Sequence, residues 1–133
     1  MAERVYCLYR GKDQESILMQ KNACHDFAEK KGWNIVGEEQ EIGVSGYKVR
    51  TDDLVKLKRI RKAAEQGEFD ILLVFMYDRL GRNLNETPFI AKWFTKKGIH
   101  VWSVYEGEII DGVDAERMLD YIRFWQTDEA QKL

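Results

Sequence analysis

Residues 69–82 have the sequence FDILLVFMYDRLGR, in which an apolar run ends abruptly in one carboxylate and two arginines. We expect a strand over residues 69–76, because its core, ILLVFM, lacks the alternation of a half-buried strand. A strand buried on both faces is typical of a parallel sheet covered by helices, and ligand sites in such sheets lie at the carboxyl ends of the strands. The stretch therefore predicts an α/β fold with a polar site directly after its central strand.

The segments on either side of this stretch show alternating strand and helix patterns. Strands are expected over residues 4–10, 33–38, 69–76 and 99–104, with a further short strand possible within 106–112. Helices are expected from Ser16 to Lys31, from Thr51 or Asp52 to Gly67, from Asn85 or Thr87 to Gly98, and from Asp114 to at least Trp125. In the third of these helices, the residues expected to face the core are Phe89, Ile90, Trp93 and Phe94. Such alternation predicts one α/β domain over residues 1–133, with a mainly parallel sheet of four or five strands flanked by helices.

Composition narrows the possible classes of function. The net charge of −2 gives no general support for nucleic-acid binding, so any contact with DNA requires a local basic cluster. The sequence has no long apolar stretch and no signal-peptide pattern, and we therefore expect a cytoplasmic protein with no membrane contact. Cys7 and Cys24 are expected to be buried free thiols. His25 and His100 show no metal-ligand spacing with them, so no metal site is expected.

Arginines follow two of the expected strands. Arg79 and Arg82 come after the central strand, and Arg10 ends the first strand. A guanidinium group stays charged and binds two phosphate oxygens at once, so three of them at one sheet edge would form a phosphate site. They converge only if the first and central strands are neighbours. Asp78 either orients an arginine and handles a leaving-group proton, or it caps a helix or forms a plain ion pair.

The segment from Gly67 to Arg82 closely resembles the catalytic domain of serine recombinases, the resolvase and invertase family. Further likenesses to that family lie at residues 5–10, at Met19-Gln20, at residues 43–46 (GVSG) and at residues 121–126. The resemblance implies a resolvase-like three-layer fold and DNA as the substrate. It also implies that strands are cleaved and rejoined through a 5′-phosphoserine intermediate, with no cofactor and no metal required.

The resemblance also suggests which residues act and how the subunits assemble. The implied catalytic residues are Arg10, Gln20, Ser45, Asp78, Arg79 and Arg82, and the expected phosphate contacts are Lys12 and Arg50. The family forms dimers and tetramers through a long helix, and the matching apolar residues here are Met118, Tyr121, Ile122 and Trp125. No helix-turn-helix or zinc module follows that helix, so we expect a catalytic domain without the DNA-recognition part of a longer recombinase.

One departure from the family pattern concerns the nucleophile. The family serine lies two residues after the first-strand arginine, where this chain has Lys12. Three explanations are open: a flexible loop is missing from this sequence, the protein has lost the serine and its activity, or Ser16 has taken over. Against the third, Ser16 has an ordinary role as the expected N-cap of its helix.

Other departures and alternatives concern the remaining segments. Arg50 is not clearly in register with the family's arginine after the glycine-serine loop, and Glu129 is followed by Ala130 where the family has arginine. The alternative function is an inactive recombinase-like domain that acts in DNA binding or subunit association. A flavodoxin-like binder of a phosphate ligand is a third possibility, although Arg10-Gly11-Lys12 lacks the glycine spacing of a phosphate loop.

Overall fold

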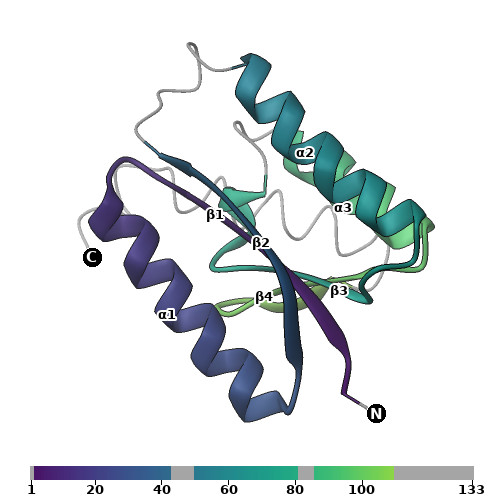
Figure 1. Ribbon diagram of the computed structural model, residues 1–133, viewed down its shortest axis with the longest axis horizontal. Helices are drawn as coiled ribbons and strands as arrows, with labels where there is room; N and C mark the ends of the chain where they lie inside the picture. Colours follow the sequence, from purple (N-terminus) through teal and green to yellow (C-terminus); the bar gives the residue numbers. More distant parts are fainter. Residues whose placement is uncertain (1, 43–49, 81–85, 110–133) are drawn as a thin grey trace.

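The computed structural model describes residues 2–42, 50–80 and 86–109, and within them five strands form one sheet (Figure 1). The strands are β1 (Arg4–Gly11), β2 (Asn34–Ile42), β3 (Ile71–Val74), β4 (His100–Ser103) and β5 (Gly107–Ile109). Their order across the sheet is β2-β1-β3-β4-β5. β1 pairs in parallel with β2 and with β3, β3 pairs in parallel with β4, and only β5 is antiparallel to its neighbour. The prediction of a mainly parallel sheet is therefore confirmed.

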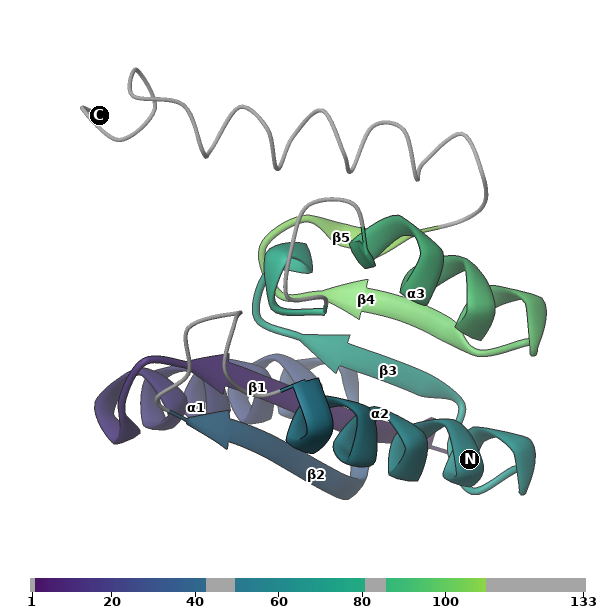
Figure 2. The same cartoon turned by 90° about the horizontal axis from the view of Figure 1, so that it is seen from above.

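Helices cover both faces of this sheet. They are α1 (Gln14–Lys31), α2 (Arg50–Glu65) and α3 (Glu86–Lys96), with a 3-10 helix, η1 (Tyr77–Arg79), after β3. Figure 1 shows α1 on one side of the strands and α2 with α3 on the other, and Figure 2 shows the strands side by side between them. This is the predicted three-layer arrangement. No helix in the described part of the chain is long and apolar enough to cross a bilayer.

The strand β3 is buried on both faces, as its sequence predicts. Ile71 and Leu73 pack in the cluster beneath α1, whereas Leu72 and Val74 pack in the cluster beneath α2 and α3. No more than 3% of any of these four side chains is exposed. Cys7 and Cys24 are buried free thiols in the α1 cluster, again as expected.

Several predicted boundaries are wrong. The central strand was expected over residues 69–76, but the chain bends at residues 75–76 because the η1 turn closes through the Arg79 N–H and the Met76 carbonyl. β2 continues to residue 42, four residues further than expected. The expected caps Thr51, Asp52 and Thr87 lie inside α2 and α3, whereas Asn85 and the helix expected from Asp114 fall outside the described residues.

Two side chains have different roles from those expected. α1 begins with Asp13 as its N-cap, and its carboxylate accepts a hydrogen bond from the Ser16 backbone N–H at 2.8 Å. Ser16 is therefore a residue of the first turn and not the cap. Phe89 is 75% exposed, because α3 turns Ile90 and Phe94 toward the core and leaves Phe89 on the opposite side.

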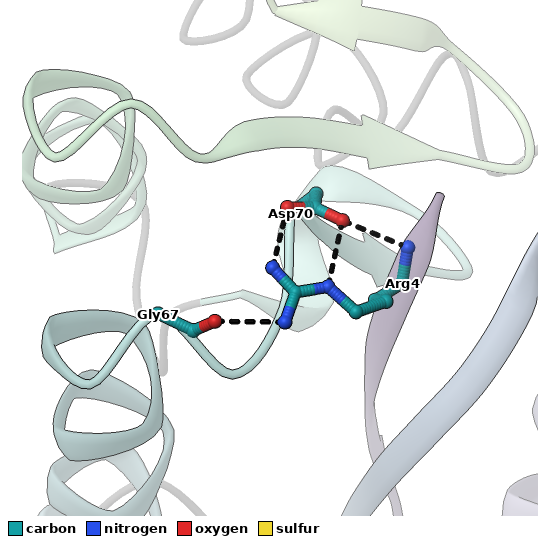
Figure 3. Close-up of polar contacts among 3 residues, drawn as sticks. All are labelled: Arg4, Gly67 and Asp70. Carbon is teal, nitrogen blue, oxygen red and sulfur yellow. Dashed lines mark hydrogen bonds and ion pairs between the residues drawn. The ribbon is translucent and has the colours of Figure 1, made fainter. Parts of the chain in front are cut away.

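Arg4 and Asp70 close the amino ends of β1 and β3 (Figure 3). The Arg4 guanidinium donates to both carboxylate oxygens of Asp70, at 3.1 and 2.9 Å, and to the Gly67 carbonyl at 2.8 Å. The Arg4 backbone N–H donates to the same carboxylate at 3.0 Å, and the Asp70 backbone N–H donates to the Arg4 carbonyl at 2.8 Å. These contacts tie the first strand, the central strand and the turn after α2 together.

We predict that Asp70 makes the stability of the protein sensitive to acid. The hydrogen bonds from Arg4 lower the pKa of the Asp70 carboxyl below its ordinary value. A lowered pKa in the folded state stabilises the protein above about pH 5, and this contribution disappears as the pH falls through the lowered value. Asp70→Asn should therefore reduce Tm near neutral pH, and the difference from the wild type should shrink as the pH falls from neutral through the lowered pKa of Asp70.

The measurement is thermal unfolding by circular dichroism across this pH range. Asp26→Asn is the matched control, because Asp26 is an exposed carboxylate that pairs with Lys30 at 3.1 Å on the surface of α1. Its effect on Tm should be small at every pH. A Tm difference for Asp70→Asn that stays constant with pH would contradict the role of the Arg4–Asp70 contact.

A second prediction concerns the core strand. Leu73→Ala should lower the free energy of unfolding by roughly 2–5 kcal/mol, because a fully buried side chain leaves a cavity between the strand and α1. Leu18→Ala on α1 is the control, since that leucine is 54% exposed and should change stability by well under about 1 kcal/mol. Urea unfolding of both variants measures the difference. Equal losses would show that β3 is not the centre of the core.

Candidate active site at the carboxyl edge of the sheet

The carboxyl ends of β1, β2 and β3 meet at one edge of the sheet because these strands are parallel. β1 and β3 are direct neighbours, with Leu8 opposite Val74. Convergence of the arginines required these two strands to be neighbours, and the sequence alone did not decide whether they are. Arg10 lies at the end of β1, and η1, which carries Arg79, lies against β1. The structure therefore brings the elements carrying Arg10 and Arg79 into contact.

A buried carboxylate holds the Arg10 side chain. Glu41 lies opposite Arg10 in the register of β1 and β2, and its Oε2 is 3.3 Å from the Arg10 Nε. Only 17% of the Arg10 side chain and 5% of the Glu41 side chain are exposed. Loss of one partner of such a pair leaves the other charge poorly compensated in the interior, so the two side chains restrain each other.

Sequence reasoning missed Glu41. The residue belongs to an acidic run, GEEQEI over residues 37–42, that looks like a solvated segment after a short strand. β2 continues through this run, and its alternation turns Glu41 inward while its neighbours stay exposed. Residues 38–42 (EEQEI) show no alternation of apolar and polar residues, so only the strand register, which places Glu41 opposite Arg10, identifies it.

Gln20 holds the backbone of the same arginine. Its side-chain Oε1 accepts from the Arg10 backbone N–H at 3.1 Å, and its Nε2 donates to the Arg10 carbonyl at 2.8 Å. Gln20 is completely buried, and it comes from α1 at the position where the sequence placed a site residue. Gln20 therefore fixes Arg10 from the backbone, while Glu41 fixes it from the side chain.

Ser16 also lies at this end of β1. The Gln20 Nε2 donates to the Ser16 Oγ at 3.3 Å. A Cβ atom added to Gly11 would lie 2.5 Å from the same oxygen, so the first turn of α1 packs directly on the end of β1. Lys12 lies in the exposed turn between β1 and α1. Both positions considered for the nucleophile are thus next in space or in sequence to Arg10.

Tyr9 precedes Arg10 but does not supply a reactive hydroxyl. Its phenol donates to the Glu38 Oε2 at 2.6 Å, and the side chain is almost completely buried. Burial, the neighbouring Cys7 thiol and the Glu38 carboxylate raise the pKa of the Tyr9 phenol. The phenol therefore stays protonated and acts as a structural contact between β1 and β2.

The turn between β4 and β5 supports η1. Glu106 Oε1 accepts from the Tyr77 backbone N–H at 3.2 Å and from the Ser103 hydroxyl at 2.6 Å. The Ser103 Oγ in turn accepts from the Glu106 backbone N–H at 2.7 Å. The Tyr77 hydroxyl donates to the Gly107 carbonyl. These bonds anchor the first residue of η1, two positions before Arg79.

The chemistry available at this edge is electrostatic. Arg10 and Arg79 present guanidinium groups from adjacent elements, and such groups stabilise negative charge on the oxygens of a reacting phosphate. In the described residues, no group of three histidine, cysteine, aspartate or glutamate side chains is placed to hold a metal ion. The arrangement suits a phosphodiester whose charge is balanced by fixed arginines.

The other expected site residues are only partly described. The backbone of Asp78 lies in η1, and that of Arg50 begins α2. Ser45 and Arg82 lie outside the described residues. The four residues expected at a subunit interface, Met118, Tyr121, Ile122 and Trp125, also lie outside them.

The fold is shared with solved recombinase domains. The N-terminal catalytic domain of TP901-1 integrase is 25% identical over 93% of this chain and 96% of its own, with a TM-score of 0.72. The C-terminal catalytic domain of ISC1926 TnpA, an IS607-like serine recombinase, is 22% identical over 91% of this chain and 79% of its own, with a TM-score of 0.65. A resolvase family site-specific recombinase from Streptococcus pneumoniae is 19% identical over 98% of this chain and 92% of its own, with a TM-score of 0.73.

The family assignment comes from the sequence itself. No curated protein matches the chain. The family model described as "Resolvase, N terminal domain" matches residues 10–129, which is most of the chain and includes the arginines of the sheet edge. The chain therefore belongs to the resolvase N-terminal domain family, the catalytic domain family of the serine recombinases.

Proposed function

We propose that residues 1–133 form a recombinase catalytic domain that cleaves and rejoins DNA strands through a phosphoserine intermediate. The observation that carries this proposal is the restraint of Arg10 by Gln20 and Glu41, beside the turn that carries Arg79. An arginine buried at the end of a strand and restrained from backbone and side chain is suited to a fixed anion site. DNA is proposed as the substrate because the chain belongs to the resolvase N-terminal domain family.

The proposed reaction is a phosphoryl transfer from the DNA backbone to a serine of the protein. The hydroxyl oxygen of a serine attacks the phosphorus of the DNA backbone and gives up its proton. The 3′ oxygen leaves and takes up a proton, so that the 5′-phosphate stays bound to the protein. The phosphoserine bond replaces the broken phosphodiester bond, and its reversal rejoins the strands without a nucleotide cofactor. Arg10, Arg79 and Arg82 would hold the non-bridging oxygens as their charge grows.

The remaining residues have supporting roles in the proposal. Gln20 positions Arg10, and Asp78 orients an arginine or transfers the leaving-group proton. Ser45 belongs to the site by its likeness to the family loop. Lys12 and Arg50 contact flanking phosphates.

The identity of the nucleophile separates an active enzyme from an inactive domain. Lys12 stands at the family position of the serine, and an amine there cannot form a phosphoserine bond. Ser16 is not the helix cap, and its hydroxyl lies beside the end of β1. Ser16 is therefore the candidate in this chain, and an inactive domain that binds DNA or other subunits is the alternative function, favoured by Lys12.

We predict that Lys12→Ser creates a reactive serine in the site. Supercoiled DNA incubated with this variant at low salt should yield a protein–DNA adduct that survives denaturing electrophoresis. Peptide mass spectrometry should place the phosphate on position 12. Lys12→Gln removes the same charge without adding a hydroxyl and is the matched control.

The wild-type chain in the same assay distinguishes the two functions. An adduct on Ser16 that Ser16→Ala abolishes would make the natural chain an active enzyme. No adduct from the wild type, but one from Lys12→Ser, would show an intact site that has lost its nucleophile. No adduct from any of these proteins would reject strand cleavage and leave the inactive domain.

Arg79 should be required wherever an adduct forms. Arg79→Ala in the adduct-forming protein should slow the reaction by about 100-fold or more, because one fixed charge on the phosphate is lost. Arg79→Lys should recover only part of the rate, since an ammonium group keeps the charge but loses the planar fork. Single-turnover adduct formation measures both, with Lys30→Ala on α1 as a control. Rates within about threefold of the parent would contradict the assigned role.

A further inference from the structure

A dense group of positive charge lies on α2 and does not include the residues of the candidate site. Five of the seven residues 56–62 (KLKRIRK) are basic, although the whole chain has a net charge of −2. α3 lies beside α2 on the same face of the sheet and adds further lysines near its carboxyl end (Figure 1). We use the term α2–α3 basic surface for Lys58, Arg61, Lys62, Lys92, Lys96 and Lys97.

An aromatic ring connects the two helices within this surface. The Arg61 guanidinium lies over the ring of Trp93, 5.0 Å from its centroid, and the Lys97 Nζ lies 5.4 Å from the same centroid. Arg61 comes from α2, Trp93 from α3, and Lys97 from the turn that follows α3. The ring therefore brings a cation of α2 and a cation of the turn after α3 together.

Most of the lysines of this surface carry charge that no carboxylate offsets. Lys58, Lys62, Lys92 and Lys96 are exposed, and none forms an ion pair with a carboxylate of the described residues. Lys30 on α1 differs, because Asp26 neutralises it at 3.1 Å. Concentrated positive charge of this kind raises the local concentration of a polyanion and speeds its association.

The basic run begins beside the candidate site. Lys56 Nζ donates to the Gln40 carbonyl, and Arg59 pairs with Glu39 at 3.4 Å. Gln40 precedes Glu41, the carboxylate that holds Arg10. The amino half of the run is thus anchored to the end of β2, and the exposed lysines continue from there along α2.

We propose that the α2–α3 basic surface binds the phosphate backbone of double-stranded DNA, as a second contact outside the candidate active site. Lys58 and Lys62 lie one helical turn apart, about 6 Å along α2, and can contact successive phosphates without reading bases. The exposed charged side chains of this surface are all lysines, and their charge matches that of a polyanion. The proposal rests on the proposed function only for the choice of DNA as the polyanion.

The test compares two pairs of exposed lysines on opposite faces of the sheet. Lys58→Gln with Lys62→Gln removes two charges from the α2–α3 basic surface. Lys21→Gln with Lys30→Gln removes two exposed charges from α1, on the opposite face of the sheet. Fluorescence anisotropy measures binding of the chain to a duplex of about 30 base pairs between about 50 and 200 mM salt.

The α2 pair should weaken binding at low salt, equally for unrelated duplex sequences, and should reduce the slope of log K against log salt by about 2. The α1 pair should leave the slope and the affinity near wild type. In a titration followed by NMR, the amides of residues 56–62 and 92–97 should shift on addition of duplex, whereas those of α1 should not.

Three results would overturn the proposal: no binding of duplex by the wild type at low salt, equal losses for the two pairs, or no loss for either pair. Lys92→Gln with Lys96→Gln replaces the α2 pair if thermal unfolding shows that the first variant is unstable.

The outcome of this test is separate from the outcome of the test of the proposed reaction. Adduct formation by Lys12→Ser with an unchanged salt slope would reject the second surface alone, whereas a reduced slope without any adduct would reject the reaction alone.

Discussion

The burial of β3 on both faces is the constraint on which the rest of the structure depends. Ile71 and Leu73 face α1, while Leu72 and Val74 face α2 and α3, so the strand is the central layer of a three-layer fold. A strand in that position pairs on both sides, and here both of its partners are parallel to it. Parallel pairing places the carboxyl ends of neighbouring strands at one edge, and the chain leaves β3 at that edge with its DRLGR sequence.

Buried polar contacts convert that edge into an ordered site. Gln20 reaches from α1 to the backbone of Arg10, Glu41 reaches from β2 to its side chain, and Glu106 reaches from the β4–β5 turn to η1. The first contact joins consecutive elements, whereas the other two join elements that are distant in sequence. Cations restrained in this way would be preorganised for an anion, as the proposed reaction requires.

The differences between prediction and structure share one physical origin. Asp13 caps α1 in place of Ser16, although both residues suit a helix start, because the actual first turn begins three residues earlier than the apolar pattern suggests. Glu41 is buried because β2 extends into an acidic run, and Phe89 is exposed because α3 is rotated toward Ile90 and Phe94. In each case the residue type permits both placements, and the folded structure selects one of them.

The amino-acid sequence by itself determined the fold class, the core strand, and the arginines that follow it, since an unbroken apolar run must be covered on both faces. Tertiary structure alone decided that β1 lies next to β3, that Glu41 pairs with Arg10, and that Arg61 lies over Trp93. These contacts join residues that are tens of positions apart, and local periodicity carries no information about which distant segment becomes a neighbour.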